Sequence, residues 1–67
     1  MDLLITHKDL AQLLSDIQFI GGEHLKLRWV SSDESGEWFA VYLTRGQVKR
    51  LNNTIPKKTI EERYHSR

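Results

Sequence analysis

Residues 24–43 read HLKLRWVSSDESGEWFAVYL, two stretches of alternating apolar and polar side chains separated by a polar turn. Alternation with a period of two is typical of strands that are buried on one face. The turn, residues 31–36, contains serines and acids and ends at Gly36. The aromatic and β-branched residues that follow it favour a second strand. We therefore expect an antiparallel hairpin at the centre of the fold.

The length of the turn decides which side chains of the hairpin share a face. A loop of three or five residues aligns one apolar set, namely Leu25, Leu27, Trp29, Phe39, Val41 and Leu43. The opposite face then carries His24, Lys26, Arg28, Trp38, Ala40 and Tyr42. A four-residue loop would instead group Trp38 and Tyr42 with the leucines. We favour the first register because it separates apolar from polar side chains better, and we expect its apolar set to be buried.

The segment before the hairpin predicts an amphipathic helix that packs on it. Thr6 offers a hydroxyl to cap the helix start, and Asp9 suits the positive end of the helix dipole. The pair Gly21-Gly22 ends the helix, because glycine tolerates left-handed backbone. The short apolar run at residues 3–5 forms an edge strand or packs as a lead-in. The apolar stripe follows helical spacing, at Leu10, Leu13, Leu14 and Ile17.

A second helix follows the hairpin at once. Thr44 and Gln47 have the spacing of a capping box, in which each side chain bonds the other's backbone N–H. Val48 and Leu51 should face inward, and Pro56 prevents continuation. Residues 54–67 form a basic tail that is either mobile or docked on a partner or on the core. Its short final helix follows a second Thr-x-x-Glu pattern and would dock through Ile55, Ile60 and Tyr64.

Together these patterns predict one small α+β domain over residues 1–67, with the order (β)αββα. An amphipathic N-terminal helix packs on an antiparallel hairpin, and one or two short C-terminal helices follow. A chain of 67 residues is near the lower limit for a self-sufficient core. The lack of cysteine excludes disulfides and thiolate metal sites. We therefore expect a homo-oligomer, most simply a dimer.

The sequence predicts a cytoplasmic protein. The absence of cysteine fits a reducing compartment. The start Met1-Asp2-Leu3 carries an acid where a secretory signal carries bases. No apolar run approaches the roughly 20 residues that span a bilayer, so no membrane association is expected.

Charge is distributed unevenly along the chain. Residues 1–43 carry seven acids and three bases, whereas residues 44–67 carry seven bases and two acids. Such asymmetry indicates a segment that faces a polyanion. Arg45, Lys49 and Arg50 on the second helix and Lys57-Lys58 after it are the candidate phosphate contacts. Lys26 and Arg28 on the hairpin would join them, beside aromatic rings on which bases could stack.

Catalytic patterns are missing. His7, His24 and His65 have no metal-ligand spacing, and Gly21-Gly22 lacks the surroundings of a phosphate loop. The acids around the hairpin turn do not have the offsets of a calcium loop. We therefore expect a non-enzymatic protein with no metal and no cofactor.

Two functions remain. The first is a small accessory or regulatory module that binds DNA or RNA through the basic C-terminal half. The alternative is a protein-interaction module, such as an inhibitor, adaptor or assembly subunit, of the kind that phages and mobile elements encode. It would bind a protein partner through Trp38, Tyr42 and Tyr64. The charge asymmetry favours the first.

Overall fold

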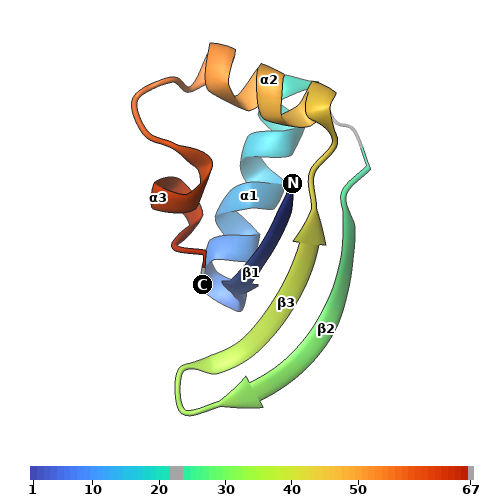
Figure 1. The fold of residues 1–67 in the computed structure, drawn as a ribbon, viewed down its shortest axis with the longest axis vertical. Coiled ribbons are helices and arrows are strands. Elements are labelled where there is room, and N and C mark those ends of the chain that lie inside the picture. The colour runs from blue at the N-terminus through green and yellow to red at the C-terminus, as the bar shows by residue number, and fades with distance from the viewer. Residues whose placement is uncertain (22–23, 67) are drawn as a thin grey trace.

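The computed structural model describes residues 1–21 and 24–66. In chain order its elements are β1 (Asp2–Thr6), α1 (His7–Ile20), β2 (Lys26–Asp33), β3 (Gly36–Tyr42), α2 (Arg45–Thr54) and α3 (Ile60–Tyr64). Figure 1 shows α1 alongside the sheet, α2 across one end of α1, and α3 on the side of α1 away from β2. The predicted α+β domain is confirmed. None of the described helices is both long and apolar enough to cross a bilayer.

The sheet has three antiparallel strands in the order β1-β3-β2. The run at residues 3–5 is therefore an edge strand, with Leu3 opposite Val41 and Ile5 opposite Phe39 on β3. Main-chain bonds of 2.8 Å in both directions between Met1 and Leu43 extend this pairing beyond β1. The N-terminal strand thus places the start of the chain beside the start of α2.

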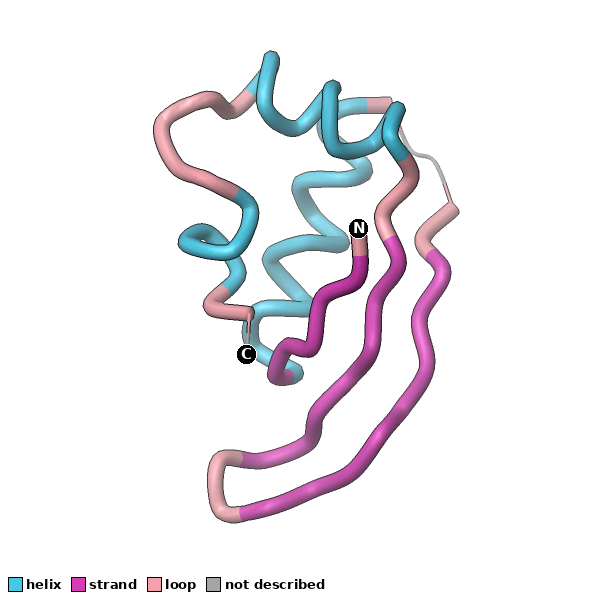
Figure 2. The backbone as a smooth tube through the Cα atoms, viewed as in Figure 1, coloured by secondary structure: helices cyan, strands magenta, loops and turns pink. Residues whose placement is uncertain are grey.

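The hairpin adopts the register favoured from the sequence, with Leu27 opposite Val41 and Trp29 opposite Phe39. The turn that produces it differs from the expectation. Only Glu34 and Ser35 connect the strands, because Asp33 pairs directly with Gly36. The odd residue needed for this register is supplied by a β-bulge between Trp29 and Ser31. Gly36 has φ of 108°, which favours glycine at this turn. Figure 2 shows the hairpin curving past the N-terminal end of α1.

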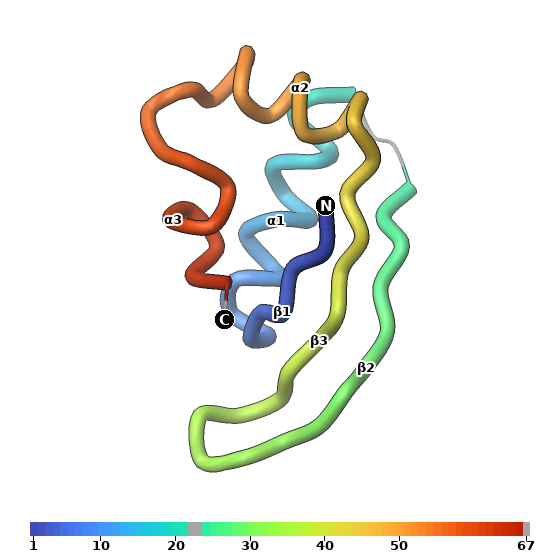
Figure 3. Tube along the Cα trace, viewed as in Figure 1, coloured from blue at the N-terminus to red at the C-terminus, as the bar shows by residue number. Residues whose placement is uncertain are grey.

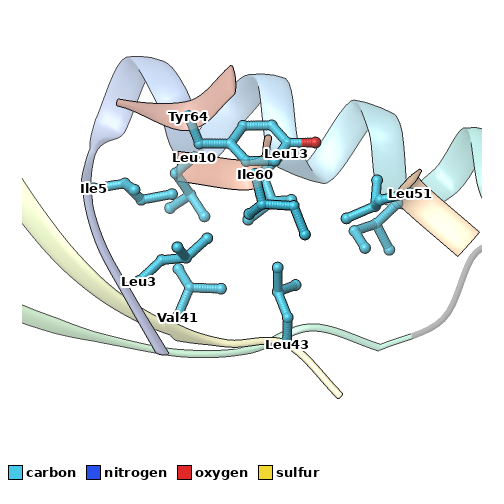
Figure 4. Close-up of a cluster of buried hydrophobic side chains, with 10 residues drawn as sticks. Leu3, Ile5, Leu10, Leu13, Val41, Leu43, Leu51, Ile60 and Tyr64 are labelled. Carbon is cyan, nitrogen blue, oxygen red and sulfur yellow. The ribbon is translucent and has the colours of Figure 1, made fainter. Parts of the chain in front are cut away.

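The core lies between the sheet and the three helices (Figure 4). Helix α1 contributes its predicted stripe, except that Leu14 lies at the margin and remains 40% exposed. The last helix docks rather than frays, since Ile60 and Tyr64 are both buried in the same cluster. The other buried apolar members are Leu3, Ile5, Leu10, Leu13, Ile17, Val41, Leu43 and Leu51.

The predicted capping box of α2 is present. The Thr44 hydroxyl accepts a 3.1 Å bond from the Gln47 N–H, and the Gln47 carboxamide oxygen accepts a 2.9 Å bond from the Thr44 N–H. The prediction for α1 was wrong in part. Thr6 occupies the N-cap position but makes no side-chain cap bond, because its hydroxyl instead donates to Asp9 at 3.4 Å.

The C-terminal end of α1 is closed as predicted by Gly21, which has φ of 144°. Its N–H bonds the carbonyls at the end of the helix. Gly22, the second glycine of the predicted stop, lies outside the described residues.

Polar side chains hold the C-terminal segments in place. Thr59 caps α3 by accepting a bond from the Glu62 N–H at 3.2 Å. The Arg63 guanidinium donates to the carbonyl oxygens of Ile55 and Lys58 and so closes the loop between α2 and α3. The Arg63 guanidinium therefore bonds the protein's own backbone.

Candidate functional site

The three helices leave one face of the sheet uncovered. Side chains alternate between faces along a strand, and Lys26, Arg28 and Tyr42 project on the side opposite the buried Val41. A shallow hollow follows this face, and its lining includes Asp2 and Leu4 from β1 and Ala40 from β3. The part of the hairpin's predicted polar face around Lys26, Arg28 and Tyr42 is therefore exposed.

Tyr42 is the accessible aromatic residue of this hollow. Its side chain is 47% exposed, Lys26 is its direct partner on β2 and Asp2 is its partner on β1. Arg28 lies two residues further along β2, opposite Ala40. Neighbouring strands are about 4.8 Å apart, so the tyrosine ring has two cations within side-chain reach.

A second groove lies along α2. Its lining combines Met1 with Arg45, Val48, Lys49, Asn52 and Asn53. Met1 lines this groove and Asp2, the next residue in the chain, lines the hollow on the sheet, but the two linings share no residue. Arg45 and Lys49 make this groove on α2 basic. In the two linings together, four cations accompany one acid.

The remaining predicted phosphate contacts lie elsewhere. Arg50 projects from α2 toward the end of α1, where one guanidinium nitrogen would be 3.2 Å from a Cβ added to Gly21. Lys57 and Lys58 are exposed in the loop between α2 and α3. Figure 3 shows that loop on the far side of the molecule from β2. Four of the seven candidate cations thus line the two depressions, with Lys26 and Arg28 on the sheet and Arg45 and Lys49 on α2.

Two of the three predicted protein-interface residues are not available to a partner. Tyr64 is fully buried in the core. Trp38 is only 7% exposed, and its indole N–H donates to the Asp33 carboxylate at 2.9 Å. Its backbone partners are Thr6 on β1 and Ser31 on β2, so it lies on the central strand of the sheet rather than at an edge. Only Tyr42 keeps the predicted exposure.

Leu27 and Trp29 form an exposed apolar surface that the sequence patterns did not predict. Leu27 and Trp29 were expected to be buried with Phe39 and Val41, yet they are 41% and 55% exposed. They project on the helix side of the sheet, but α1 packs over β1 and β3. His7 at the start of α1 reaches only as far as Phe39 on β3, with ring centroids 6.2 Å apart. The position of β2 at the sheet edge is the signal that explains the exposure.

The described residues contain no group of three or more His, Asp and Glu side chains that could hold a metal ion. Comparison with protein-family models, with curated proteins and with solved structures gives no match for this chain. A functional assignment therefore depends on the chemistry of its own surfaces, among which the sheet face combines the exposed Tyr42 with two cations.

Proposed function

We propose that this protein is a small non-enzymatic module that binds single-stranded nucleic acid on the uncovered face of its sheet. The observation that carries the proposal is the exposed Tyr42 ring, which has Lys26 as its strand partner and Arg28 beside it. An exposed aromatic ring among cations suits a flexible polyanion whose bases can stack while its phosphates are paired.

The groove on α2 offers a second basic surface along which a bound nucleic-acid strand could continue. Arg45 and Lys49 line that groove together with Met1, the residue before Asp2 of the sheet face. A nucleic-acid strand that stacks a base on Tyr42 would meet Lys26 and Arg28 beside the ring, and one that also reaches α2 would meet Arg45 and Lys49. Contacts of this kind carry little base specificity, because every base has a face that stacks. An accessory role on single strands of mixed sequence therefore fits the surface best.

The stacking contact is tested at Tyr42. Fluorescence anisotropy with labelled single-stranded DNA and RNA oligonucleotides should show weaker binding by Tyr42→Ala, by about 1–3 kcal/mol for one stacked base. Tyr42→Phe keeps the ring and should bind within about twofold of the wild type. Equal losses in both variants would contradict stacking.

The phosphate contacts are tested by salt. Removing both cations in Arg45→Gln/Lys49→Gln should lower the slope of log affinity against log salt by about 1.4, since each single-strand phosphate contact contributes about 0.7. Lys57→Gln/Lys58→Gln changes the net charge equally but lies in the loop away from the site, so it is the matched control. Identical slopes in the two double variants would assign the effect to net charge alone. Absence of binding to any oligonucleotide at low salt would overturn the proposal.

The second candidate, a protein-interaction module, is favoured by one observation. Leu27 and Trp29 leave apolar area exposed on the helix side of the edge strand β2. Exposed aromatic residues in a defined patch mark contact surfaces.

A further inference from the structure

The two edge strands of the sheet, β1 and β2, differ in whether another segment covers them. On β1 the Leu4 N–H donates to the Ser66 hydroxyl at 3.4 Å, so the C-terminal segment covers that side. On β2 the outer side has no neighbouring strand or helix within the described part of the chain. Strand β2 is also the longest, with eight residues. An uncovered edge presents backbone N–H and C=O groups that can pair with another strand.

The charges along β2 run from basic to acidic. Lys26 and Arg28 lie at its start and Asp33 at its end, followed by Glu34 in the turn. When a strand pairs antiparallel with a second copy of itself, the start of one lies beside the end of the other. Such a pair therefore brings opposite charges together at both ends, which stabilises cross-strand contacts.

The bulge decides which register is possible. Before the bulge, Lys26 and Arg28 project on the uncovered face, opposite Tyr42 and Ala40. After the bulge the alternation shifts by one residue, so that Ser31, opposite Trp38, and then Asp33 project on that face. Full pairing of the eight-residue strands sets Lys26 opposite the partner's Asp33 and Arg28 opposite the partner's Ser31. In both pairs the two opposing side chains then project on the same face of the joined sheet. Registers centred on residue 27 or 28 would instead oppose Lys26 to the partner's Arg28, or Arg28 to the partner's Arg28.

We infer that the chain forms a two-fold dimer through antiparallel β2–β2 pairing, with Lys26 opposite the partner's Asp33. The product is a six-stranded sheet in which the two-fold axis is normal to the sheet. Trp29 and Leu27 of both copies then lie together near the axis on the helix side, which covers apolar area that one chain leaves exposed.

The same axis places both uncovered faces on the same side of the joined sheet. The two hollows around Tyr42 would therefore face the same way. The dimer itself does not depend on nucleic-acid binding, so the two proposals fail separately.

The absence of cysteine in the chain makes a cross-linking test specific. Opposite residues on paired strands have Cα atoms about 4.5–5.5 Å apart, within disulfide range. Mixing Arg28→Cys with Ser31→Cys under mild oxidation should yield mainly the mixed disulfide dimer by mass spectrometry. Each variant alone should cross-link poorly, because residue 28 is offset from the partner's residue 28 by three positions, about 10 Å. Equal yields of all three dimers would overturn the register.

Charge placement gives an independent measurement by sedimentation equilibrium. Ser31→Arg puts like charges opposite each other at two symmetric positions and should weaken the dimer about tenfold. Adding Arg28→Glu to that variant restores opposite charges and should recover the wild-type dissociation constant. Ser15→Arg, on the exposed side of α1, is the matched control and should change nothing. A wild-type chain that stays monomeric at millimolar concentration, or a dimer indifferent to Ser31→Arg, would overturn the inference.

Discussion

The Tyr64 hydroxyl donates a 2.8 Å hydrogen bond to the Asp16 carboxylate and so joins the last helix to the first. The tyrosine ring is fully buried within the core (Figure 4). The guanidinium carbon of Arg63 lies 5.9 Å from the centre of that ring. A helix of only five residues cannot be stable alone, so this contact and the burial of Ile60 explain why α3 is ordered.

Tyr64→Phe should lower the free energy of unfolding by about 1–2 kcal/mol. The ring stays in place, but the Asp16 carboxylate loses its donor. Urea denaturation followed by circular dichroism measures the change. Tyr42→Phe removes an exposed hydroxyl and is the control, expected within about 0.5 kcal/mol of the wild type. Equal effects would show that the Asp16 contact contributes nothing.

The same residue predicts an alkaline pH dependence. Burial, together with the hydrogen bond to Asp16, raises the pKa of Tyr64 above its ordinary value. The folded state therefore holds the phenolic proton more tightly than the unfolded chain does. Its contribution is complete below the unfolded pKa of about 10 and is lost as the pH rises beyond that value. Stability curves of wild type and Tyr64→Phe should converge above about pH 10. Parallel curves up to pH 11 would contradict the shift.

Leu13 and Leu14 are neighbours on α1 with opposite environments. Leu13 is fully buried, whereas Leu14 is 40% exposed. Leu13→Ala should cost about 2–5 kcal/mol through lost burial and a cavity. Leu14→Ala should cost well under half of that, and the exposed Lys49→Ala about 0.5 kcal/mol or less. Comparable losses for the two leucines would show that the helix faces the sheet at another angle.

Gln47 is a buried polar side chain that joins three segments. Its carboxamide accepts from the Thr44 N–H and donates to the His24 carbonyl oxygen, both at 2.9 Å. Gln47→Ala should cost about 2 kcal/mol, because the partly buried Thr44 N–H and His24 carbonyl lose their partners. Gln12→Ala, on the exposed side of α1, is the matched control and should be nearly neutral. Thermal denaturation of the two variants compares them directly.

Two glycines should respond in opposite directions to alanine. Gly21 has φ of 144° and an added Cβ would lie 3.2 Å from an Arg50 nitrogen, so Gly21→Ala should cost about 1 kcal/mol or more. Gly46 lies in the first turn of α2 and an added Cβ would have no neighbour nearer than 3.9 Å. Gly46→Ala should therefore stabilise the protein by about 0.5–1 kcal/mol. The denaturant midpoint should fall for Gly21→Ala and rise for Gly46→Ala.

The local elements of this protein could be predicted from its sequence. Alternation in residues 24–43 indicated the hairpin and its register, the spacing of Leu10, Leu13 and Ile17 indicated the buried stripe of α1, and Thr44 with Gln47 indicated the start of α2. Each depends on contacts between residues close in the chain, whose geometry the strand and helix periods fix. The candidate cations were also evident as residue types, although their grouping was not.

The tertiary structure alone decided which surfaces are covered. Trp29 is exposed because β2 is an edge strand and α1 packs over β1 and β3. Trp38 is buried on the central strand β3, where its indole N–H donates to Asp33. Tyr64 became a core residue through a hydrogen bond to a helix 48 positions earlier. Arg45 and Lys49 share a groove with Met1 only because pairing with Leu43 brings the start of the chain beside α2. Residue alternation assigns a side chain to one of two faces, but which face is buried, and how far along it, depends on long-range packing that no local pattern encodes.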